Sequence, residues 1–407
     1  MDNIFAKINK DINIKPFRRQ YMNNLECLRN SILSKLKNDE VFSKFYNGVY
    51  LKGNIHPYRS YGDNLKVKYP DEYDLVIRLK LPEIHRIIVV KDHKVPGNVI
   101  LDLTEVLQTI SNQTQHVKTH KVLKKCVNEH NLLSIRLLQS WLEGRFTKAL
   151  QDLHSQIVFE GTVSAITYRK QGPAHTIFIK TPYKYSVDFV PAIVLCPSQA
   201  ITYVTGSWDA IPKPIKDVPN VISFRASYDC LENELINDKK TLKNALRIMK
   251  KFRDRHQNMS NLKSYYIKTL FLWRAAKEST FFWSQPISCV VIALFQDLRT
   301  SLKERNLPFF WDKELNLYEK IGEAAILEMT KCVVCKTDAL EKYKIIRKKS
   351  INDDFKIYEI FLTEEERIRM GIRKMAITPT NEATQFFTER EEVTTPDVSS
   401  WSKCIMS

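Results

Sequence analysis

The chain has 407 residues, and its 63 Lys and Arg against 46 Asp and Glu give a formal net charge of +17. Hydrophobic residues make up 43% and aromatic residues 11%, which is enough for a core and excludes a wholly disordered chain. No run of about 18 apolar, uncharged residues occurs, so we expect no transmembrane helix. The charge favours a polyanionic partner, either nucleic acid or an anionic membrane face, although a merely basic surface has the same composition.

The N-terminal residues contain no apolar segment of the kind found in a secretory signal, and the eight cysteines are scattered along the chain. We therefore expect reduced thiols and a cytoplasmic protein. The chain has only 10 glycines and contains neither G-x-x-x-x-G-K-[ST] nor G-x-G-x-x-G. These absences exclude Walker-type ATPases, Rossmann dehydrogenases and protein kinases, so any nucleotide must be bound in another way.

The expected elements follow one another in three blocks. Apolar residues at helical spacing, from Phe17 to Leu36, predict one long helix or a broken pair over residues 3–46. Short β-rich segments predict strands within 49–60, 65–82 and 85–92, followed by helix over 120–153 and three more strands within 164–195. From about residue 228 the pattern is mostly helical, with a last helix from about 314 to 340.

This order predicts an α+β fold in which a mixed lobe joins a helical lobe. We place an N-terminal spine helix region at 1–46, a mixed β-sheet core at 47–205 and a C-terminal helical lobe at 206–375. The remaining residues, 376–407, are rich in Thr, Ser and Glu and lack apolar periodicity, so we expect a disordered tail.

The sharpest chemical feature is a pair of acids on one predicted strand. Side chains alternate along a strand, so Glu72 and Asp74 share a face while Tyr73 points into the core. Asp188 is a lone acid on a second predicted strand. If the two strands are neighbours, the three carboxylates form a site for two Mg²⁺ that can align a nucleoside triphosphate with a hydroxyl. By itself the acid pair is a weak signal and favours exposed acids with no ligand, with Asp188 unrelated to them.

The spacing of several sequence blocks favours the metal site over exposed acids with no ligand. RSYGDNLKVKYPDEYDLVIRL (59–79) is similar to the GSYYxxVKxxxPxEFDVMxxL block of the cyclic GMP-AMP synthase family of nucleotidyltransferases, the cGAS-like receptors. YSVDFV (185–190) resembles the third-acid strand of that family, and SFRASYDCLENELI (223–236) resembles its arginine-containing base-binding segment. LKNALRIMKKFRD (242–254) and LKSYYIKTLFLW (262–273) resemble the segments that close over the nucleotides. The resemblance covers residues 5–345 and implies a bilobed nucleotidyltransferase fold.

The resemblance also implies roles for individual residues. Glu72, Asp74 and Asp188 would hold two Mg²⁺ or Mn²⁺ ions, and Asp188 would help to activate the attacking hydroxyl. Ser60 would touch the triphosphate and Arg225 a base or phosphate. Lys250 would reach phosphates, while Tyr265, with Ser264 beside it, would stack a base. The implied activity is the joining of ATP and GTP into a cyclic dinucleotide, a cyclic GMP-AMP, as an innate immune messenger.

Two departures from the family pattern bear on this. Arg59 stands where the family has the glycine that precedes the serine. The vertebrate zinc insertion is replaced by a short segment near 237–240, and the Cys332-x-x-Cys335 pair lacks a second pair, so we expect no zinc. The chain thus resembles the insect-type receptors, which implies double-stranded RNA as the activator, with oligomerisation on the nucleic acid as a further option.

Cations along the predicted helices fit an RNA backbone, which is bound mainly through phosphates and shape, although charge runs are also ordinary solvated faces. The candidate contacts are Lys10, Lys15, Arg18, Arg19, Arg29, Lys121, Lys124, Lys125 and Lys251. The last four residues, beginning with Cys404, match a C-a-a-X box, so weak membrane association through a prenyl group is a further hypothesis, against a chance cysteine.

Two other functions remain open. The first is a catalytically inactive relative whose pocket is altered by Arg59 and which acts as a binding or scaffold protein. The second is a linear, poly(A)-type polymerase, because such enzymes share the three acids. The residues do not specify the linkage isomer or the base order of a cyclic product.

Overall fold

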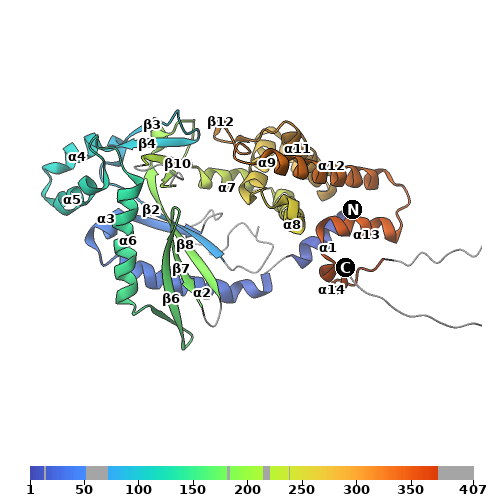
Figure 1. The fold of residues 1–407 in the computed structure, drawn as a ribbon, viewed down its shortest axis with the longest axis horizontal. Helices are drawn as coiled ribbons and strands as arrows, with labels where there is room; N and C mark the ends of the chain where they lie inside the picture. The colour runs from blue at the N-terminus through green and yellow to red at the C-terminus, as the bar shows by residue number, and fades with distance from the viewer. Residues whose placement is uncertain (13–14, 52–71, 181–183, 214–220, 238, 375–407) are drawn as a thin grey trace, which may run out of the picture.

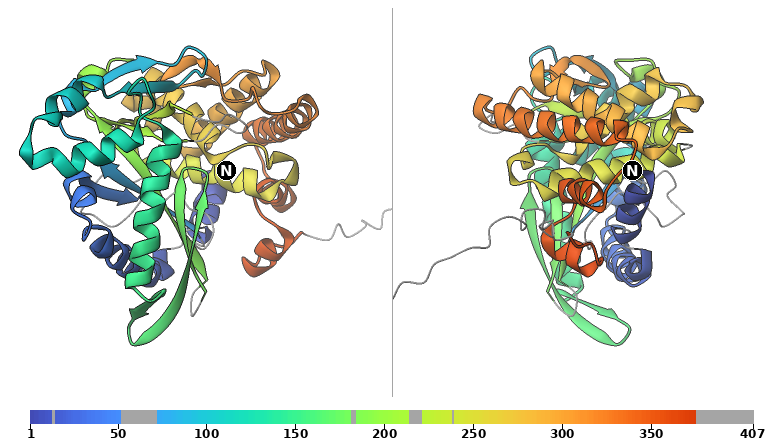
Figure 2. Two further views of the ribbon diagram at one scale, coloured as in Figure 1. Left: turned by 60° about the vertical axis from the view of Figure 1, so that its left-hand side comes forward. Right: turned by 90° about the vertical axis from the view of Figure 1, so that its right-hand side faces the viewer.

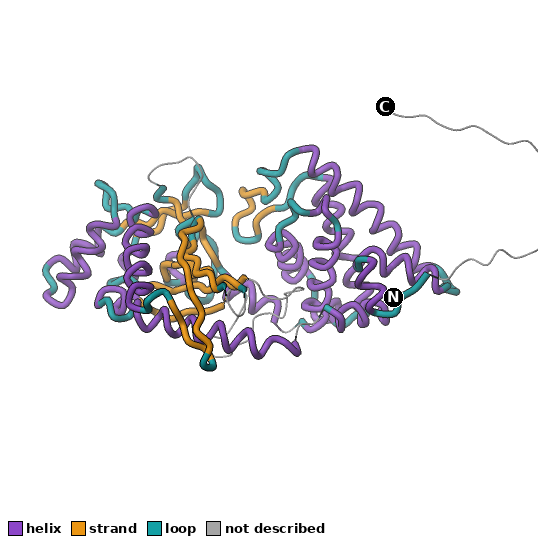
Figure 3. The backbone as a smooth tube through the Cα atoms, turned by 60° about the horizontal axis from the view of Figure 1, so that its bottom comes forward, coloured by secondary structure: helices purple, strands orange, loops and turns teal. Residues whose placement is uncertain are grey.

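The protein is described here from a computed structural model that covers residues 1–12, 15–51, 72–180, 184–213, 221–237 and 239–374. A lobe built around a β-sheet and a lobe built of helices lie side by side along the longest axis (Figures 1 and 3). This is the predicted α+β, bilobed architecture. Ser60, Arg59, Cys404 and the predicted tail 376–407 lie outside the described residues.

Ten strands form the main sheet of the described chain, in the order β3-β4-β10-β9-β8-β7-β6-β5, with β2 also pairing β8 and β1 pairing β2. Their bounds are β1 (Tyr46–Leu51), β2 (Glu72–Leu79), β3 (Ile88–Lys91), β4 (Asn98–Asp102), β5 (Gln156–Phe159), β6 (Thr162–Gln171), β7 (Ala174–Ile179), β8 (Tyr185–Leu195), β9 (Trp208–Ile211) and β10 (Ser223–Ser227).

Strand β8 is the centre of this sheet. Its pairing with β2 is parallel and runs from Ser186 to Ile193. On its other edge it pairs antiparallel with β7 through its first half and with β9 through its last three residues. All but two of its eleven residues are buried, which fits a central strand covered on both faces.

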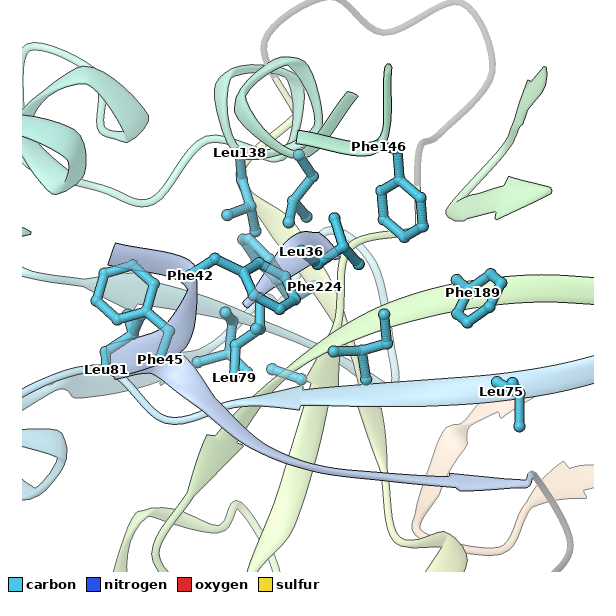
Figure 4. Packing of buried hydrophobic residues seen from close by; sticks show 14 of the residues in the cluster. Leu36, Phe42, Phe45, Leu75, Leu79, Leu81, Leu138, Phe146, Phe189 and Phe224 are labelled. Atoms are coloured by element: carbon cyan, nitrogen blue, oxygen red, sulfur yellow. The ribbon is translucent and has the colours of Figure 1, made fainter. Parts of the chain in front are cut away.

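Helices cover one face of the sheet. They are α2 (Lys15–Leu36), α3 (Glu40–Phe45), α4 (Thr104–Ser111), α5 (Val117–Cys126) and α6 (Ile135–Asp152), with short 3-10 turns at Ile84–Arg86, Thr114–His116 and Pro197–Gln199. Leu36, Phe42, Phe146, Phe189 and Phe224 pack into one apolar cluster between these helices and the strands (Figure 4). Burying such large aromatic and aliphatic side chains is the main source of stability for this lobe.

The helical lobe has its own core. It contains α1 (Asp2–Asp11), α7 (Asp229–Asn237), α8 (Lys240–Arg255), α9 (Ser264–Lys277), α10 (Thr280–Trp283), α11 (Ile287–Lys303), α12 (Glu323–Ile345), α13 (Ile351–Phe361) and α14 (Glu364–Arg369), with a 3-10 turn at Gln257–Met259 and a hairpin of β11 (Pro308–Phe309) and β12 (Asp312–Asn316). The long α12 runs across the other helices (Figure 2). None of the helices in the described part of the chain is long and apolar enough to cross a bilayer.

The N-terminal region is divided between the lobes, which corrects the predicted single spine region at 1–46. Helix α1 ends at Asp11, and its Phe5 packs edge-on against Phe361 of α13, with ring centroids 5.4 Å apart. Helix α2 instead packs on the sheet lobe through Leu25, Leu28 and Ile32. The apolar stripe from Phe17 to Leu36 corresponds to α2 alone, and the first turns belong to a different core.

The predicted boundary between core and helical lobe, at residues 205 and 206, is also wrong. Strands β9 and β10 extend the sheet to Ser227, beyond that boundary. The helix predicted from about 314 begins only at Glu323, because the hairpin β11–β12 occupies the preceding residues. These strands are too short, at two to five residues, to show a clear alternating pattern.

Candidate active site

Parallel pairing of β2 with β8 brings three acids together. Asp74 lies directly opposite Asp188, and Glu72 lies opposite Ser186. One carboxylate oxygen from each of Glu72, Asp74 and Asp188 can be chosen so that all three lie within 4.8 Å of one another. Glu72 and Asp74 are exposed and Asp188 is half-buried. The sheet therefore produces a compact carboxylate trio whose members come from two distant parts of the chain.

Alternation along β2 explains why the acids face outward. Tyr73 and Leu75 are 4% and 2% exposed, because they point toward the helices that cover the opposite face. The Tyr73 ring packs edge-on against Tyr185 at the start of β8, with centroids 5.8 Å apart. These contacts hold both strands in register, since a slip by one residue would bury the acids and expose the aromatic rings.

A third strand supports Asp188. Thr176 of β7 lies opposite Asp188 on the other side, and its hydroxyl donates a hydrogen bond of 2.6 Å to Oδ1 of the carboxylate. Burial raises the pKa of Asp188, the Thr176 hydrogen bond lowers it, and the nearby Asp74 charge raises it again. Thr176 is 1% exposed. Thr176 carries no motif that predicts its role, because its position depends on how β7 pairs with β8.

The trio fits a divalent metal site. Hard cations such as Mg²⁺ prefer carboxylate oxygens, and three acids this close repel one another unless a positive charge lies between them. Within the described residues, this is the one group of three or more His, Cys, Asp or Glu side chains with such spacing. Glu72, Asp74 and Asp188 are thus the residues that could hold the ions.

Toward the C-terminal ends of β2 and β8, the face of the sheet that carries the acids is first apolar and then polar. Val76 and Val190 lie two residues after Asp74 and Asp188, and both belong to a small buried cluster. Further along, Arg78 donates a 2.9 Å hydrogen bond to Asp209, which also accepts one of 3.0 Å from Tyr50. Two layers of buried contacts therefore hold the strands rigidly behind the acids.

Arg225 and Tyr265, both predicted to contact the nucleotides, meet at Phe309. The Arg225 guanidinium lies 5.7 Å from the Phe309 ring centroid, and the Tyr265 ring lies 6.1 Å from it. Arg225 also approaches Gly97 so closely that a Cβ there would lie 2.4 Å from Nη1. Burial lowers the pKa of Arg225, because the charged guanidinium is partly removed from water. An anionic ligand beside Arg225 would therefore stabilise its charged form. Phe309 and Gly97 carry no motif that the sequence could have shown.

Glu232 of α7 organises a buried polar cluster beneath Tyr265. The Tyr265 hydroxyl donates a 2.7 Å hydrogen bond to Glu232 Oε1, and the Trp311 indole donates one of 2.9 Å to the same oxygen. Lys268 lies 2.8 Å from Oε2. Burial and the Glu232 charge raise the pKa of Tyr265 well above its usual range. The hydroxyl is thus engaged inside the protein, and only the ring is suited to meet a base.

The remaining residues predicted to contact nucleotides or nucleic acid differ in exposure and in their partners. Ser264 begins α9, and its hydroxyl accepts a 2.5 Å hydrogen bond from Arg253. Lys250 is half-buried on α8, the helix that packs against α9. Lys251, predicted to contact nucleic acid, is only 6% exposed and forms an ion pair with Glu366 of α14. That assignment is corrected, because a buried, paired lysine joins two helices of the lobe and presents no charge to a partner.

The predicted nucleic-acid contacts do not share one helix. Lys10 is exposed on α1 of the helical lobe, and Arg29 is half-buried on α2 of the sheet lobe. The side chains of Lys15, Arg18 and Arg19 lie outside the described residues. Lys121, Lys124 and Lys125 are exposed on α5, at the end of the sheet lobe remote from α12 (Figure 1).

A carboxylate trio on paired parallel strands, together with Arg225 of β10 and Tyr265 of α9, which both lie near Phe309, defines a nucleotidyltransferase. Comparison with known families agrees, since residues 61–238 match the Mab-21 protein nucleotidyltransferase domain and residues 241–335 match the Mab-21 protein HhH/H2TH-like domain.

Comparison with individual proteins identifies the family within this class. A cyclic GMP-AMP synthase-like receptor of Lucilia cuprina is 41% identical over 346 residues, which cover 84% of this chain and 92% of that protein. Cyclic GMP-AMP synthase-like receptor 1 of Drosophila melanogaster is 40% identical over 326 residues, 77% of this chain and 84% of the relative. A cyclic GMP-AMP synthase-like receptor of Aethina tumida is 31% identical over 314 residues, which cover 74% of this chain and 77% of that protein. The chain belongs to the cyclic GMP-AMP synthase-like receptor family, which confirms the resemblance in its sequence blocks.

Proposed function

We propose that this nucleotidyltransferase is a cytoplasmic sensor of innate immunity that is activated by double-stranded RNA and joins ATP and GTP into a cyclic GMP-AMP. The observation that carries the proposal is the trio of Glu72, Asp74 and Asp188, held in register on β2 and β8. The names of the relatives, which are cyclic GMP-AMP synthase-like receptors, support the cyclic product.

In this proposal the three acids bind the ions, and Asp188 also helps to activate the attacking ribose hydroxyl. Two Mg²⁺ or Mn²⁺ ions, when bound, would neutralise the triphosphate and favour departure of pyrophosphate. Thr176 holds Oδ1 of Asp188. The proton of the attacking ribose hydroxyl would then pass to Oδ2.

Residues of both lobes would orient the nucleotides. Arg225 would contact a base or phosphate, and the Tyr265 ring, whose hydroxyl is fixed by Glu232, would stack a base. Lys250 would reach phosphates, Ser264 lies beside Tyr265 at the start of α9, and Ser60 would touch the triphosphate. The exposed lysines of α5, with Lys10 and Arg29, would bind RNA phosphates without reading bases.

The test is a product assay with labelled ATP and GTP, Mg²⁺, and either no ligand, double-stranded RNA or double-stranded DNA. We expect a phosphatase-resistant dinucleotide that forms only with RNA. Activation by DNA alone would contradict the proposed ligand. A ladder of phosphatase-sensitive products would show a linear polymerase, and failure of ATP and GTP to bind even with Mg²⁺ and RNA present would show an inactive relative.

A further inference from the structure

The connection between α12 and α13 carries a dense group of cations. We define residues 342–351 as the basic tip, and its cations are Lys342, Lys344, Arg347, Lys348 and Lys349. All five are exposed. No ion pair involving any of them occurs among the described residues, and the tip itself contains no Asp or Glu. Its positive charge is therefore concentrated at one place on the surface.

Two isoleucines are exposed among these cations. Ile345, the last residue of α12, is 78% exposed, and Ile351, the first residue of α13, is 53% exposed. They are two of the eight large apolar residues in the described chain with more than half of their surface open. Helix α12 instead turns Leu340 and Tyr343 inward to the lobe core. The tip is thus both strongly basic and partly apolar.

The tip has a fixed shape. Tyr343 of α12 donates a hydrogen bond to Asp354 of α13, and Lys349 donates one of 2.9 Å to the carbonyl of Ile346. Ser350 and Asp353 cap α13 reciprocally. The nearest acids on either side of the tip are engaged elsewhere, since Glu341 accepts a 2.7 Å hydrogen bond from Gln296, Asp353 caps α13 and Asp354 accepts from Tyr343. The bond from Tyr343 to Asp354 ties the two helices together, and within the described residues none of these acids forms an ion pair with the tip cations.

We propose that the basic tip docks on an anionic phospholipid bilayer. Clusters of four to eight Lys and Arg are typical of surfaces that bind phosphatidylserine or phosphoinositide headgroups. An exposed isoleucine beside these cations lowers its free energy when it enters the interfacial region of a bilayer. An RNA backbone offers such a side chain no apolar partner. The combination of charge and exposed aliphatic side chains therefore favours a membrane over nucleic acid.

The position of the tip is compatible with simultaneous binding of RNA. The tip lies at one end of the long axis and α5 lies at the other end (Figures 1 and 3). Docking through the tip would leave the α5 lysines and the carboxylate trio open to their own ligands. The inference does not depend on the catalytic proposal, because membrane binding requires neither nucleotides nor product formation.

The experiment is co-sedimentation of the full chain with vesicles of phosphatidylcholine alone or mixed with phosphatidylserine. We expect binding to the mixed vesicles only, weakening as salt is raised. Each cation near an anionic surface contributes about fivefold to partitioning, so the triple variant Lys344→Glu, Arg347→Glu and Lys348→Glu should lose at least about 100-fold. Equal binding by this variant and the unaltered chain would overturn the proposal.

A matched control separates the tip from net charge. Lys303, Lys320 and Lys331 are exposed on the same lobe but scattered, so reversing all three to Glu makes the same change in charge. We expect this control to lose less than about tenfold, because screening limits distant charges to weak effects. An equal loss in both triple variants would show generic electrostatic attraction and overturn the assignment of the tip.

A neutral substitution separates lipid from RNA. Ile345→Asn keeps every charge and removes only the aliphatic side chain, which is exposed and contributes little to folding. We expect several-fold weaker binding to mixed vesicles with unchanged binding to double-stranded RNA and an unchanged melting temperature. If Ile345→Asn binds vesicles normally while the tip triple variant loses RNA, the tip is a nucleic-acid surface and the membrane proposal is wrong.

Discussion

Asp74 and Asp188 lie directly opposite each other on the parallel strands β2 and β8, although they are far apart in the sequence. Thr176 of β7 continues the same row on the other side of Asp188. The register of three strands therefore sets the spacing of the acids, and the residues of the core that fix this register indirectly fix the site. Changes that shift a strand should affect metal binding even when no acid is altered.

Replacing Thr176 by Val should weaken metal binding. The substitution keeps the shape of a buried side chain and removes the hydroxyl that bonds Asp188. A hydrogen bond to a charged carboxylate is worth about 1.5–3 kcal/mol, so we expect the Mg²⁺ concentration for half-maximal product formation to rise roughly tenfold or more. Thr176→Ser retains the hydroxyl and should stay near the unaltered value. Equal Mg²⁺ dependence in both variants would show that Thr176 does not position Asp188.

Gly97→Ala tests the placement of Arg225. The added Cβ would lie 2.4 Å from Arg225 Nη1, so the guanidinium must move. Gly161 is a matched control, because its φ is also +77° but nothing lies within 4 Å of the added Cβ. Both substitutions should cost about 1 kcal/mol of stability through the left-handed backbone. Only Gly97→Ala should weaken nucleotide binding, measured by titration calorimetry, and an equal effect of both would separate Arg225 from the nucleotide site.

The Tyr265 ring, rather than its hydroxyl, should bind the nucleotide. Tyr265→Phe loses the hydrogen bond to Glu232 but keeps the aromatic face. Stacking on a base is worth about 1–3 kcal/mol, so Tyr265→Ala should raise KM by roughly fivefold to 100-fold, whereas Tyr265→Phe should change it by less than about threefold. If Phe and Ala raise KM equally, the hydroxyl and its bond to Glu232 matter more than stacking.

Features that depend on neighbouring residues could be predicted from the sequence, whereas features that depend on contacts between distant elements could not. The acids were found because alternation on β2 is local and because the sequence blocks resemble a known family. The three-acid site was predicted only on the condition that the two strands are neighbours. The structure meets this condition, because β2 pairs with β8. Thr176, Gly97, Phe309 and Glu232 were missed, since each acts through a contact with a residue on another element.

The errors have the same origin. A run of basic residues shows no difference between exposed and buried lysines, so Lys251 was grouped with surface cations, although it pairs with Glu366 more than one hundred residues later. The predicted region 1–46 rests on the apolar stripe from Phe17 to Leu36, and the sequence does not show that the residues before this stripe pack on a different core. Strands β9 and β10 are too short for periodicity to reveal.

Buried His175 should make the stability of the protein depend on pH. It is fully buried, and its Nδ1 lies 2.8 Å from the Tyr168 hydroxyl. Burial lowers the pKa of His175 from 6.5 to about 3. The unfolded chain therefore binds one proton more than the folded chain between these values, and stability falls as pH drops below about 6.5.

The expected loss is roughly 1 kcal/mol of unfolding free energy between pH 7.0 and pH 5.5, relative to a His175→Gln variant. Denaturant titrations of both proteins at the two pH values measure it. The comparison uses the change with pH rather than absolute stability, so a general weakening of the variant does not affect it. Identical pH dependence in the two proteins would show that His175 is not held neutral by the fold.

Product formation by Asp74→Asn with double-stranded RNA, ATP, GTP and Mg²⁺ tests most directly whether the carboxylate trio is the catalytic centre. The exposed Asp74 contributes little to the core, so the variant should fold, melt and bind RNA like the unaltered chain. We expect the variant to lose product formation by at least about 100-fold, because one of the three metal-binding carboxylates is neutral. Full activity in this folded variant would contradict the assignment of the trio on β2 and β8 as the catalytic centre.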